Sequence, residues 1–230
     1  MLTLEALHLR QDTFSLQAEL TAARGQIIAV MGPSGAGKST LLSALGGFLI
    51  PQAGRIYWDG TDITYTPPAA RPMAMVFQDN NLFVHLSASQ NVALGLRPNM
   101  RLDARQRAQV ASALARVGLS DMARRKPAQL SGGQQGRVAL ARVLVQSRPI
   151  LLLDEPFAAL GPALRAEMLD LVAELARDLD ALVLMVTHLP EDAARIADQI
   201  ILVAEGQAHP PQEAQSLLDD PPPALRAYLG

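Results

Sequence analysis

Cysteine is absent from this sequence of 230 residues, which excludes disulfide bonds and thiolate metal sites and is compatible with a reducing compartment. Long apolar runs are missing too. The longest, at 181–186 and 150–153, fall far short of the roughly 20 residues that span a bilayer and are typical of buried strands. We therefore expect a chain that is not itself a channel. Residues 1–5 lack the charged start and continuous apolar stretch of a secretory signal, so we expect the protein to stay in the cytoplasm.

Net charge is also small. The formal charge of −2 at pH 7 gives no overall attraction to nucleic acid, and we expect no nucleic-acid partner. The two arginine-rich stretches, 101–107 and 124–126, are most simply solvated helix faces rather than a binding patch. Because 49% of the residues are hydrophobic, the chain can form one sizeable core, or one core with a smaller lobe attached.

The order of hydrophobic patterns predicts an α/β fold. Residues 2–9 and 14–20 alternate apolar and polar side chains, as half-exposed strands do, and indicate an antiparallel flap. Residues 26–31 are almost wholly apolar, which is typical of a parallel strand covered on both faces. Further short apolar runs, separated by helical patterns, follow at 73–77, 149–153, 181–187 and 199–204. This alternation favours a mostly parallel sheet covered by helices.

One stretch breaks this alternation. From 86 to 129 the sequence carries helical patterns, notably over 103–117, and no convincing strand. We predict a single domain over residues 1–230, in which residues 1–85 and 149–230 form the α/β core with its β flap. A helical lobe over residues 86–148 is inserted into that core.

A glycine-rich segment joins the first buried strand to a helical pattern. It fits G-x-x-x-x-G-K-[ST], in which glycines let backbone N–H groups converge on phosphate oxygens and the helix N-terminus adds positive charge. In this interpretation Lys38 reaches the β and γ phosphates and Ser39 ligates Mg²⁺. An ordinary glycine-rich turn is the alternative. The residues of this phosphate cradle are Gly32, Pro33, Ser34, Gly35, Ala36, Gly37, Lys38, Ser39 and Thr40.

An acidic pair ends a second buried strand. Asp154 is predicted to hold Mg²⁺ through water, and Glu155 to accept a proton from an attacking water as a general base. Alone, such a pair is more often a solvated loop, but together with the cradle it indicates nucleotide hydrolysis. Both motifs are common to all P-loop NTPases and do not distinguish among them.

The segment 130–142, LSGGQQGRVALAR, lies just upstream of the acidic strand and resembles the signature of ABC ATPases. The motif order, from the cradle through Gln78, the signature and the acidic pair to His188, resembles this family over almost the whole chain. The resemblance implies the ABC ATPase fold, with a P-loop NTPase core, and it implies ATP and Mg²⁺ as cofactors. The signature residues implied to contact ATP are Ser131, Gly132, Gly133 and Gln134.

Ser131 and the two amides after it open a helical pattern, so they can form a second anion site. A flexible linker is the alternative. One subunit cannot aim both anion sites at the same phosphate. The resemblance therefore implies a head-to-tail homodimer, in which each ATP lies between one subunit's cradle and the other's signature. It also makes Gln78 a contact to Mg²⁺ and the attacking water, and His188 a γ-phosphate contact, although each alone is typical of an ordinary surface residue.

Two positions depart from the family pattern. The adenine-stacking aromatic of the flap has no clear counterpart, because only Phe14 is available and its alternation indicates a core position. Gly161 stands where the family usually has an aspartate. Pro162 suits the first helical position, which makes Gly161 the N-cap, so the turn is kept while a carboxylate that couples the two sites in the family is lost. A nucleotide-binding regulatory module without useful turnover is therefore kept as an alternative.

The Asp-Glu-Pro-Phe form of the acidic motif, the short chain and the absence of fused membrane helices resemble bacterial importer subunits. Several segments are similar to the ATPases of thiamine and thiamine pyrophosphate importers, at 66–68, 71–72, 77–83, 85–86, 90–91 and 95–98. An importer ATPase does not touch the transported molecule, so this assignment depends on likeness alone. An importer ATPase for another small solute and a soluble ABC ATPase outside transport are the alternatives.

The resemblance implies transmembrane permease subunits as partners and a periplasmic substrate-binding protein as an indirect one. It also implies a peripheral position on the cytoplasmic face of the inner membrane. We expect the permease to dock on the loop 78–86, because Phe77, Leu82, Phe83 and Leu86 form an apolar stretch there. Ordinary core packing of these side chains is the alternative.

Overall fold

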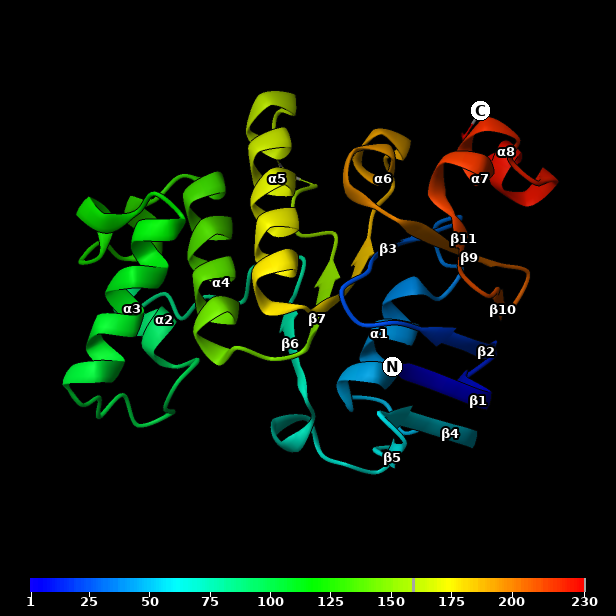
Figure 1. The fold of residues 1–230 in the computed structure, drawn as a ribbon, viewed down its shortest axis with the longest axis horizontal. Helices are drawn as coiled ribbons and strands as arrows, with labels where there is room; N and C mark the ends of the chain where they lie inside the picture. The colour runs from blue at the N-terminus through cyan, green and yellow to red at the C-terminus, as the bar shows by residue number, and fades with distance from the viewer. Residues whose placement is uncertain (159, 230) are drawn as a thin grey trace.

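The computed structural model describes residues 1–158 and 160–229. Within these residues the strands form one 11-stranded sheet in the order β5-β4-β1-β2-β10-β9-β3-β8-β7-β6, with β11 paired to β9. Figure 1 shows α2 and α3 at the end of the molecule opposite β1 and β2. The predicted α/β class is confirmed, with a mostly parallel core sheet and an antiparallel flap.

The flap contains more strands than the two that the sequence predicted. β1 (Leu2–Gln11) pairs antiparallel with β2 (Phe14–Ala22), as expected. On its other side β1 pairs with β4 (Ala53–Trp58), which sequence analysis missed. Only Ile56 and Trp58 are buried in β4. Two buried positions are too few to produce a recognisable alternation.

The parallel part of the sheet is almost wholly buried. β3 lies between β8 and β9 and runs parallel to both, and β7 and β6 extend the sheet in the same direction. Each strand lies within one residue of the apolar run that predicted it, because strands covered on both faces are apolar throughout. Their bounds are β3 (Ile27–Met31), β6 (Met73–Val76), β7 (Ile150–Asp154), β8 (Leu182–Val186) and β9 (Gln199–Ala204). The short strands are β5 (Thr61–Asp62), β10 (Gln207–Ala208) and β11 (Gln212–Glu213).

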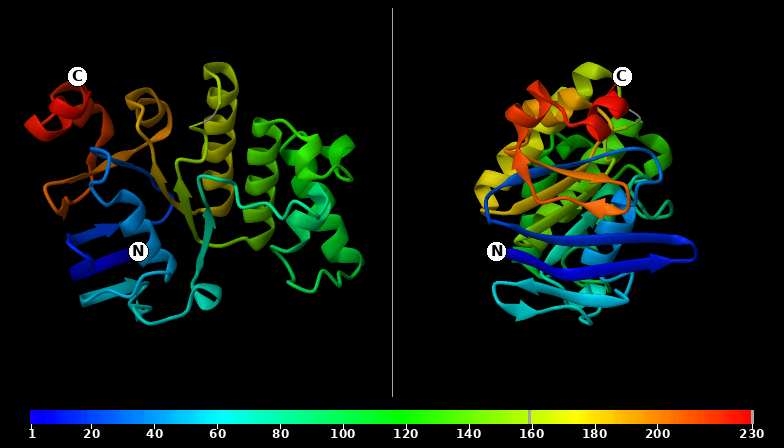
Figure 2. Two further views of the ribbon diagram at one scale, coloured as in Figure 1. Left: turned by 180° about the vertical axis from the view of Figure 1, so that it is seen from behind. Right: turned by 90° about the vertical axis from the view of Figure 1, so that its right-hand side faces the viewer.

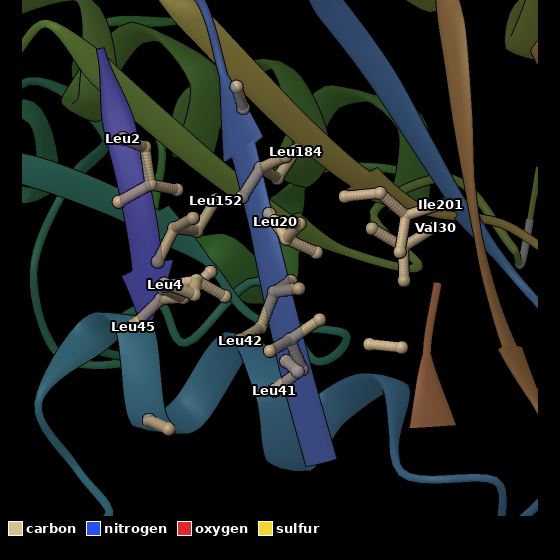
Figure 3. Packing of buried hydrophobic residues seen from close by; sticks show 14 of the residues in the cluster. Leu2, Leu4, Leu20, Val30, Leu41, Leu42, Leu45, Leu152, Leu184 and Ile201 are labelled. Atoms are coloured by element: carbon tan, nitrogen blue, oxygen red, sulfur yellow. The ribbon is translucent and has the colours of Figure 1, made fainter. Parts of the chain in front are cut away.

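Helix α1 (Lys38–Gly46) packs between the flap and the parallel strands. Figure 3 shows Leu41, Leu42 and Leu45 of this helix facing Leu4 and Leu20 of the flap. The same cluster includes Val30, Leu152, Leu184 and Ile201 from the parallel strands. Full burial of a leucine side chain contributes about 1.5–3 kcal/mol. This cluster therefore fixes the helix whose first residues belong to the phosphate cradle.

A second cluster lies between the parallel strands and the helices α4 and α5, with Leu140, Leu153 and Met168 at its centre. Figure 2 shows the molecule from behind and from the side, with the chain from α2 to α4 in green, β1 and β2 of the flap in blue and β4 in cyan. The bounds of the later helices are α4 (Gly132–Gln146), α5 (Pro162–Leu179), α6 (Pro190–Ile196), α7 (Ala214–Asp219) and α8 (Pro223–Leu229).

Helices α2 (Ala88–Ala93) and α3 (Ala104–Arg116) pack with α4 around a third cluster that includes Val92, Leu114 and Val138. The helix predicted over 103–117 is confirmed, since Asp103 caps α3 through a bond from the Gln106 amide of 2.8 Å. None of the helices in the described parts of the chain is both long and apolar enough to cross a membrane.

Candidate nucleotide-binding site

The cradle follows β3 directly, and two of its glycines are required by close backbone approaches. Gly32 has φ 146°, and a Cβ there would lie 2.0 Å from the carbonyl oxygen of Val203. Gly37, the N-cap of α1, has φ 102°, and a Cβ would lie 2.3 Å from Cζ of Phe14. Only glycine fits both positions. The first amides of α1 therefore remain free to meet an anion.

Lys38 is buried within the cradle. Its Nζ donates to the carbonyl oxygens of Gly32 at 2.7 Å and Pro33 at 2.9 Å. Burial lowers the pKa of Lys38, while the charges of Glu155 and Asp154 act in the opposite direction. The side chain is thus curled along the loop, with its ammonium group beside the amides that a phosphate would contact.

Two of the three predicted metal ligands, Ser39 and Asp154, lie together, whereas Gln78 lies beyond β6. The Ser39 hydroxyl donates to Oδ1 of Asp154 at 3.0 Å, although the residues are 115 positions apart. Burial raises the pKa of Asp154, and the Ser39 bond opposes this shift. Within residues 1–158 and 160–229 there is no cluster of three or more His, Cys, Asp or Glu side chains suited to a metal. The pair of hard oxygen donors fits Mg²⁺, which binds through one or two protein ligands together with substrate phosphates and water.

Glu155 and His188 meet at the neighbouring strand end. Glu155 has a positive φ of 46°, and its amide donates to the carbonyl of Val186 at 3.2 Å. Oε1 of Glu155 contacts Nε2 of His188, which follows β8. Because β3, β7 and β8 are parallel, their carboxyl ends bring these groups to the edge that carries the cradle. One pocket there is lined by Gln11, Phe14, Ser34, Gly35, Gly37, Lys38, Ser39, Thr40, Glu155 and His188.

The signature segment forms the N-terminus of α4, away from this pocket. Ser131 caps the helix by accepting from the Gln134 amide at 3.3 Å, and the Gln134 side chain accepts from the Ser131 amide at 2.9 Å. Gly132 is exposed, and a Cβ on Gly133 would lie 2.2 Å from Cδ2 of Leu164 in α5. No signature residue is among those that line the pocket around Lys38. The first-turn amides of Gly132 and Gly133 have no acceptor within the helix.

Gln78 lies just beyond β6, and its side chain is exposed. β6 pairs with β7, with Val76 opposite Leu153, so Gln78 is at the same sheet edge as Asp154. Sequence analysis missed the group that holds this loop. The Arg142 guanidinium of α4 donates to the carbonyl oxygens of Asn80 at 2.8 Å and Asn81 at 2.9 Å. These two residues have positive φ values of 55° and 48°.

Phe14 and Tyr228 also belong to this site although sequence analysis did not assign them to it. Phe14 is half-buried against the first hydrophobic cluster, as its alternation indicated, but it also lines the pocket beside Gly37. The Tyr228 hydroxyl lies 2.9 Å from Nδ1 of His188. The apolar and polar alternation of the strand indicated the core contact of Phe14 but not its contact with the pocket. No local pattern marks the contact of Tyr228 with His188.

Comparison with known proteins agrees with this geometry. The family profile described as ABC transporter matches residues 16–158. The chain is 59% identical to the thiamine import ATP-binding protein ThiQ of Cereibacter sphaeroides over 230 residues, which is 100% of both chains. It is 58% identical to the protein of the same name from Ruegeria sp., again over 100% of both chains. It is 52% identical to that of Brucella suis over 217 residues, 94% of this chain and 90% of the relative.

Two solved structures are similar over most of the chain. A dimeric post-hydrolysis state of the ATP-binding cassette MJ0796 bound to ADP and Pi has a TM-score of 0.81 at 30% identity, covering 93% of this chain and 99% of that one. The structure of cbiO1 from Clostridium perfringens, part of the ABC transporter complex cbiONQ, has a TM-score of 0.83 at 31% identity, covering 95% and 90%. The profile match, these identities and the shared architecture show that the chain belongs to the ABC transporter family and has the ABC ATPase fold.

Proposed function

We propose that the chain is the ATP-hydrolysing subunit of a bacterial importer for thiamine or thiamine pyrophosphate. The chain is an ATPase by its family. The observation that carries the proposal is the convergence of the cradle, Glu155 and His188 on one pocket, with Ser39 of that pocket hydrogen-bonded to Asp154. Three separate strand ends supply these groups, so the groups that one chain contributes to phosphoryl transfer to water lie at one sheet edge.

In this proposal the chain's residues divide the chemistry among them. Lys38 and the cradle amides hold the β and γ phosphates, and Ser39 and Asp154 hold Mg²⁺, with Gln78 as a further contact to the metal and the water. When bound, Mg²⁺ neutralises phosphate charge. Glu155 accepts the proton of the water that attacks the γ-phosphorus, the bond to the β-phosphate oxygen breaks, and ADP and phosphate leave. His188 contacts the γ-phosphate from the side of β8.

We infer that the ATP site is completed by a second copy of the chain. The first-turn amides of Gly132 and Gly133 and the Ser131 hydroxyl can form an anion site, and none of these three residues lines the chain's own pocket. A head-to-tail homodimer would bring them to the partner's γ-phosphate. The dimer of the similar cassette bound to ADP and Pi supports this inference.

The transported molecule is inferred from likeness. Relatives at 50–59% identity over 94–100% of this chain carry the name of thiamine import ATP-binding proteins. The implied partners are permease subunits and, through them, a periplasmic binding protein, so the chain would sit peripherally on the cytoplasmic face of the inner membrane. The helices within 86–148 would form the lobe that moves with the permease.

An exposed apolar surface supports docking of the permease at the loop 78–86. Phe83 and Val84 are 50% and 72% exposed, and the nearby loop after α1 exposes Phe48 and Ile50 by 57% and 67%. The rings of Phe48 and Phe77 pack edge to face at 5.6 Å, which joins the two loops. Leu82 instead packs partly into the second and third clusters. Phe83 is therefore the better position for a charge substitution.

Two variants test the proposed ATPase site. We expect Lys38→Ala to lose nucleotide binding nearly completely, whereas Glu155→Gln should keep binding and lose phosphate release. Both are measured on the purified subunit and on the subunit assembled with its permease. Ordinary turnover by Glu155→Gln would remove Glu155 from the role of base.

Uptake measurements test the transported molecule. In cells that lack their own importer, the wild-type chain with its permease and binding protein should restore uptake of labelled thiamine, and Lys38→Ala should not. Phe83→Glu should weaken association with the permease without unfolding the free subunit, with Tyr65→Glu, on the exposed flap, as its control. Restored ATPase activity without thiamine uptake would favour another small solute.

A further inference from the structure

The last helix of the chain reaches back to the candidate catalytic residues. The hydroxyl of Tyr228, in α8, donates to the backbone carbonyl of His188 at 3.0 Å and lies 2.9 Å from Nδ1 of the same residue. The two rings are tilted by 53° with centroids 6.3 Å apart. One hydroxyl therefore contacts both the main chain and the side chain of His188.

Packing sets the position of this hydroxyl. The ring of Tyr228 lies half-buried against a cluster that contains Ala193 of α6, Leu217 of α7 and Leu225 of α8. Burial raises the pKa of Tyr228, and the charge of Glu155 raises it further, so the phenol keeps its proton at neutral pH. The hydroxyl is thus a fixed donor rather than a mobile surface group.

The two contacts assign the proton on one side of the imidazole. A backbone carbonyl can only accept, so it takes the single phenol proton. Nδ1 of His188 must then donate its own proton to the phenol oxygen. In histidine the partner of one ring nitrogen sets the role and direction of the other. Tyr228 consequently turns Nε2 toward Glu155 and the pocket, and Nε2 needs a proton of its own to donate to the Glu155 carboxylate.

We propose that Tyr228 is a positioning residue for ATP hydrolysis, which holds the rotamer of His188 from behind and keeps the Nδ1 proton in its hydrogen bond to the phenol oxygen. The proposal rests on the proposed function, in which Nε2 of His188 contacts the γ-phosphate. Tyr228 itself touches neither the cradle nor the acidic pair. Its loss should therefore slow turnover and leave nucleotide binding unchanged.

Nitrogen-15 NMR of the free subunit tests the contact without any assay of activity. The chain has four histidines, and the His188 signals are those lost in His188→Gln. We expect Nδ1 of His188 in the wild-type protein to carry a proton that exchanges slowly with solvent, and this exchange to be faster in Tyr228→Phe. A wild-type His188 with its proton on Nε2 alone, or with a rapidly exchanging Nδ1 proton, would overturn the proposal.

Kinetics of the transporter assembled with its permease test the role. We expect Tyr228→Phe to lower kcat about 5-fold, about 1 kcal/mol at 1.36 kcal/mol per tenfold, with an unchanged KM for ATP and melting temperature. Tyr65→Phe, which alters an exposed tyrosine on the flap, is the matched control and should behave as wild type. If Tyr228→Phe had the wild-type kcat while His188→Ala turned over slowly, the role of Tyr228 would be refuted and the role of His188 would stand. Wild-type turnover in His188→Ala would refute the role of His188 and this proposal with it.

Discussion

Arg71 offers a test of how the helix behind the cradle is held. Its side chain is 2% exposed and lies at the C-terminal end of α1. Nη1 donates to the carbonyl oxygens of Ala44, at 2.8 Å, and Leu45, in the last turn of the helix. Nε and Nη2 donate at 2.8 Å to the carbonyl oxygens of Thr66 and Thr64. A cation is thus buried at the negative end of α1, where it also ties down the chain that follows the flap.

The magnitude follows from these four acceptors. Arg71→Met keeps most of the apolar stem and removes every donor, which leaves four carbonyls without their partner. A hydrogen bond to a charged group contributes about 1.5–3 kcal/mol, but burial disfavours the charged guanidinium and lowers the pKa of Arg71, which offsets part of that gain. We expect a net loss of about 3–5 kcal/mol of unfolding free energy, the usual cost of breaking a buried charged contact.

Denaturant unfolding followed by circular dichroism measures this loss. At about 2–4 °C per kcal/mol for a chain of this size, the melting temperature should fall by about 6–20 °C. Arg71→Lys keeps a charge but not the planar fork, so we expect an intermediate loss. Arg55→Met is the control, because Arg55 is 48% exposed and its nitrogen is 3.8 Å from Asp62; it should change stability by less than about 0.5 kcal/mol. Equal effects of Arg71→Met and Arg55→Met would refute the reasoning.

Three further predictions concern the dimer, Gly161 and pH. Ser131→Arg should leave nucleotide binding by each subunit intact but suppress turnover. Sedimentation should find Glu155→Gln protein dimeric only with ATP. ATP hydrolysis by a complex with Ser131→Arg in both copies would contradict the head-to-tail dimer with ATP between the subunits. Gly161→Asp should raise the ATPase rate of the assembled transporter at a nearly unchanged melting temperature, because Gly161 has φ −67° and no atom of the described residues beyond its chain neighbours lies within 4 Å of its Cβ position. An unchanged rate would show that the carboxylate is dispensable. A hydrogen bond from Arg24 lowers the pKa of Asp59 from 3.8 to about 2, so its stabilisation is present above pH 3.8 and is lost as pH falls toward 2. Asp59→Asn should therefore be less stable than wild type at pH 7, and urea titrations should find the difference narrowing through that window.

Local pattern was sufficient for the parallel strands β3, β6, β7, β8 and β9 and for the motifs at their ends. The apolar runs at 26–31 and 149–153 predicted β3 and β7 within one residue, because strands buried on both faces admit only apolar side chains. The cradle and the acidic pair are each a short continuous segment at the end of a strand. Gly161 as the N-cap of α5 was likewise predicted from the proline beside it. Each of these features depends on neighbours in sequence, and for that reason sequence alone determined them.

The partners of the site residues were decided by tertiary packing. Phe14 alternates like a core residue, yet it packs against both the core and Gly37, 23 positions away in the chain. Tyr228 meets His188 across 40 residues and Arg142 meets Asn80 across 62. Such contacts depend on where α8 and α4 lie against the sheet, and helix placement is set by the shape of the buried clusters rather than by any local pattern. The sequence therefore determined which groups the chain has for phosphate chemistry, and only the folded structure decided what holds each of them in place.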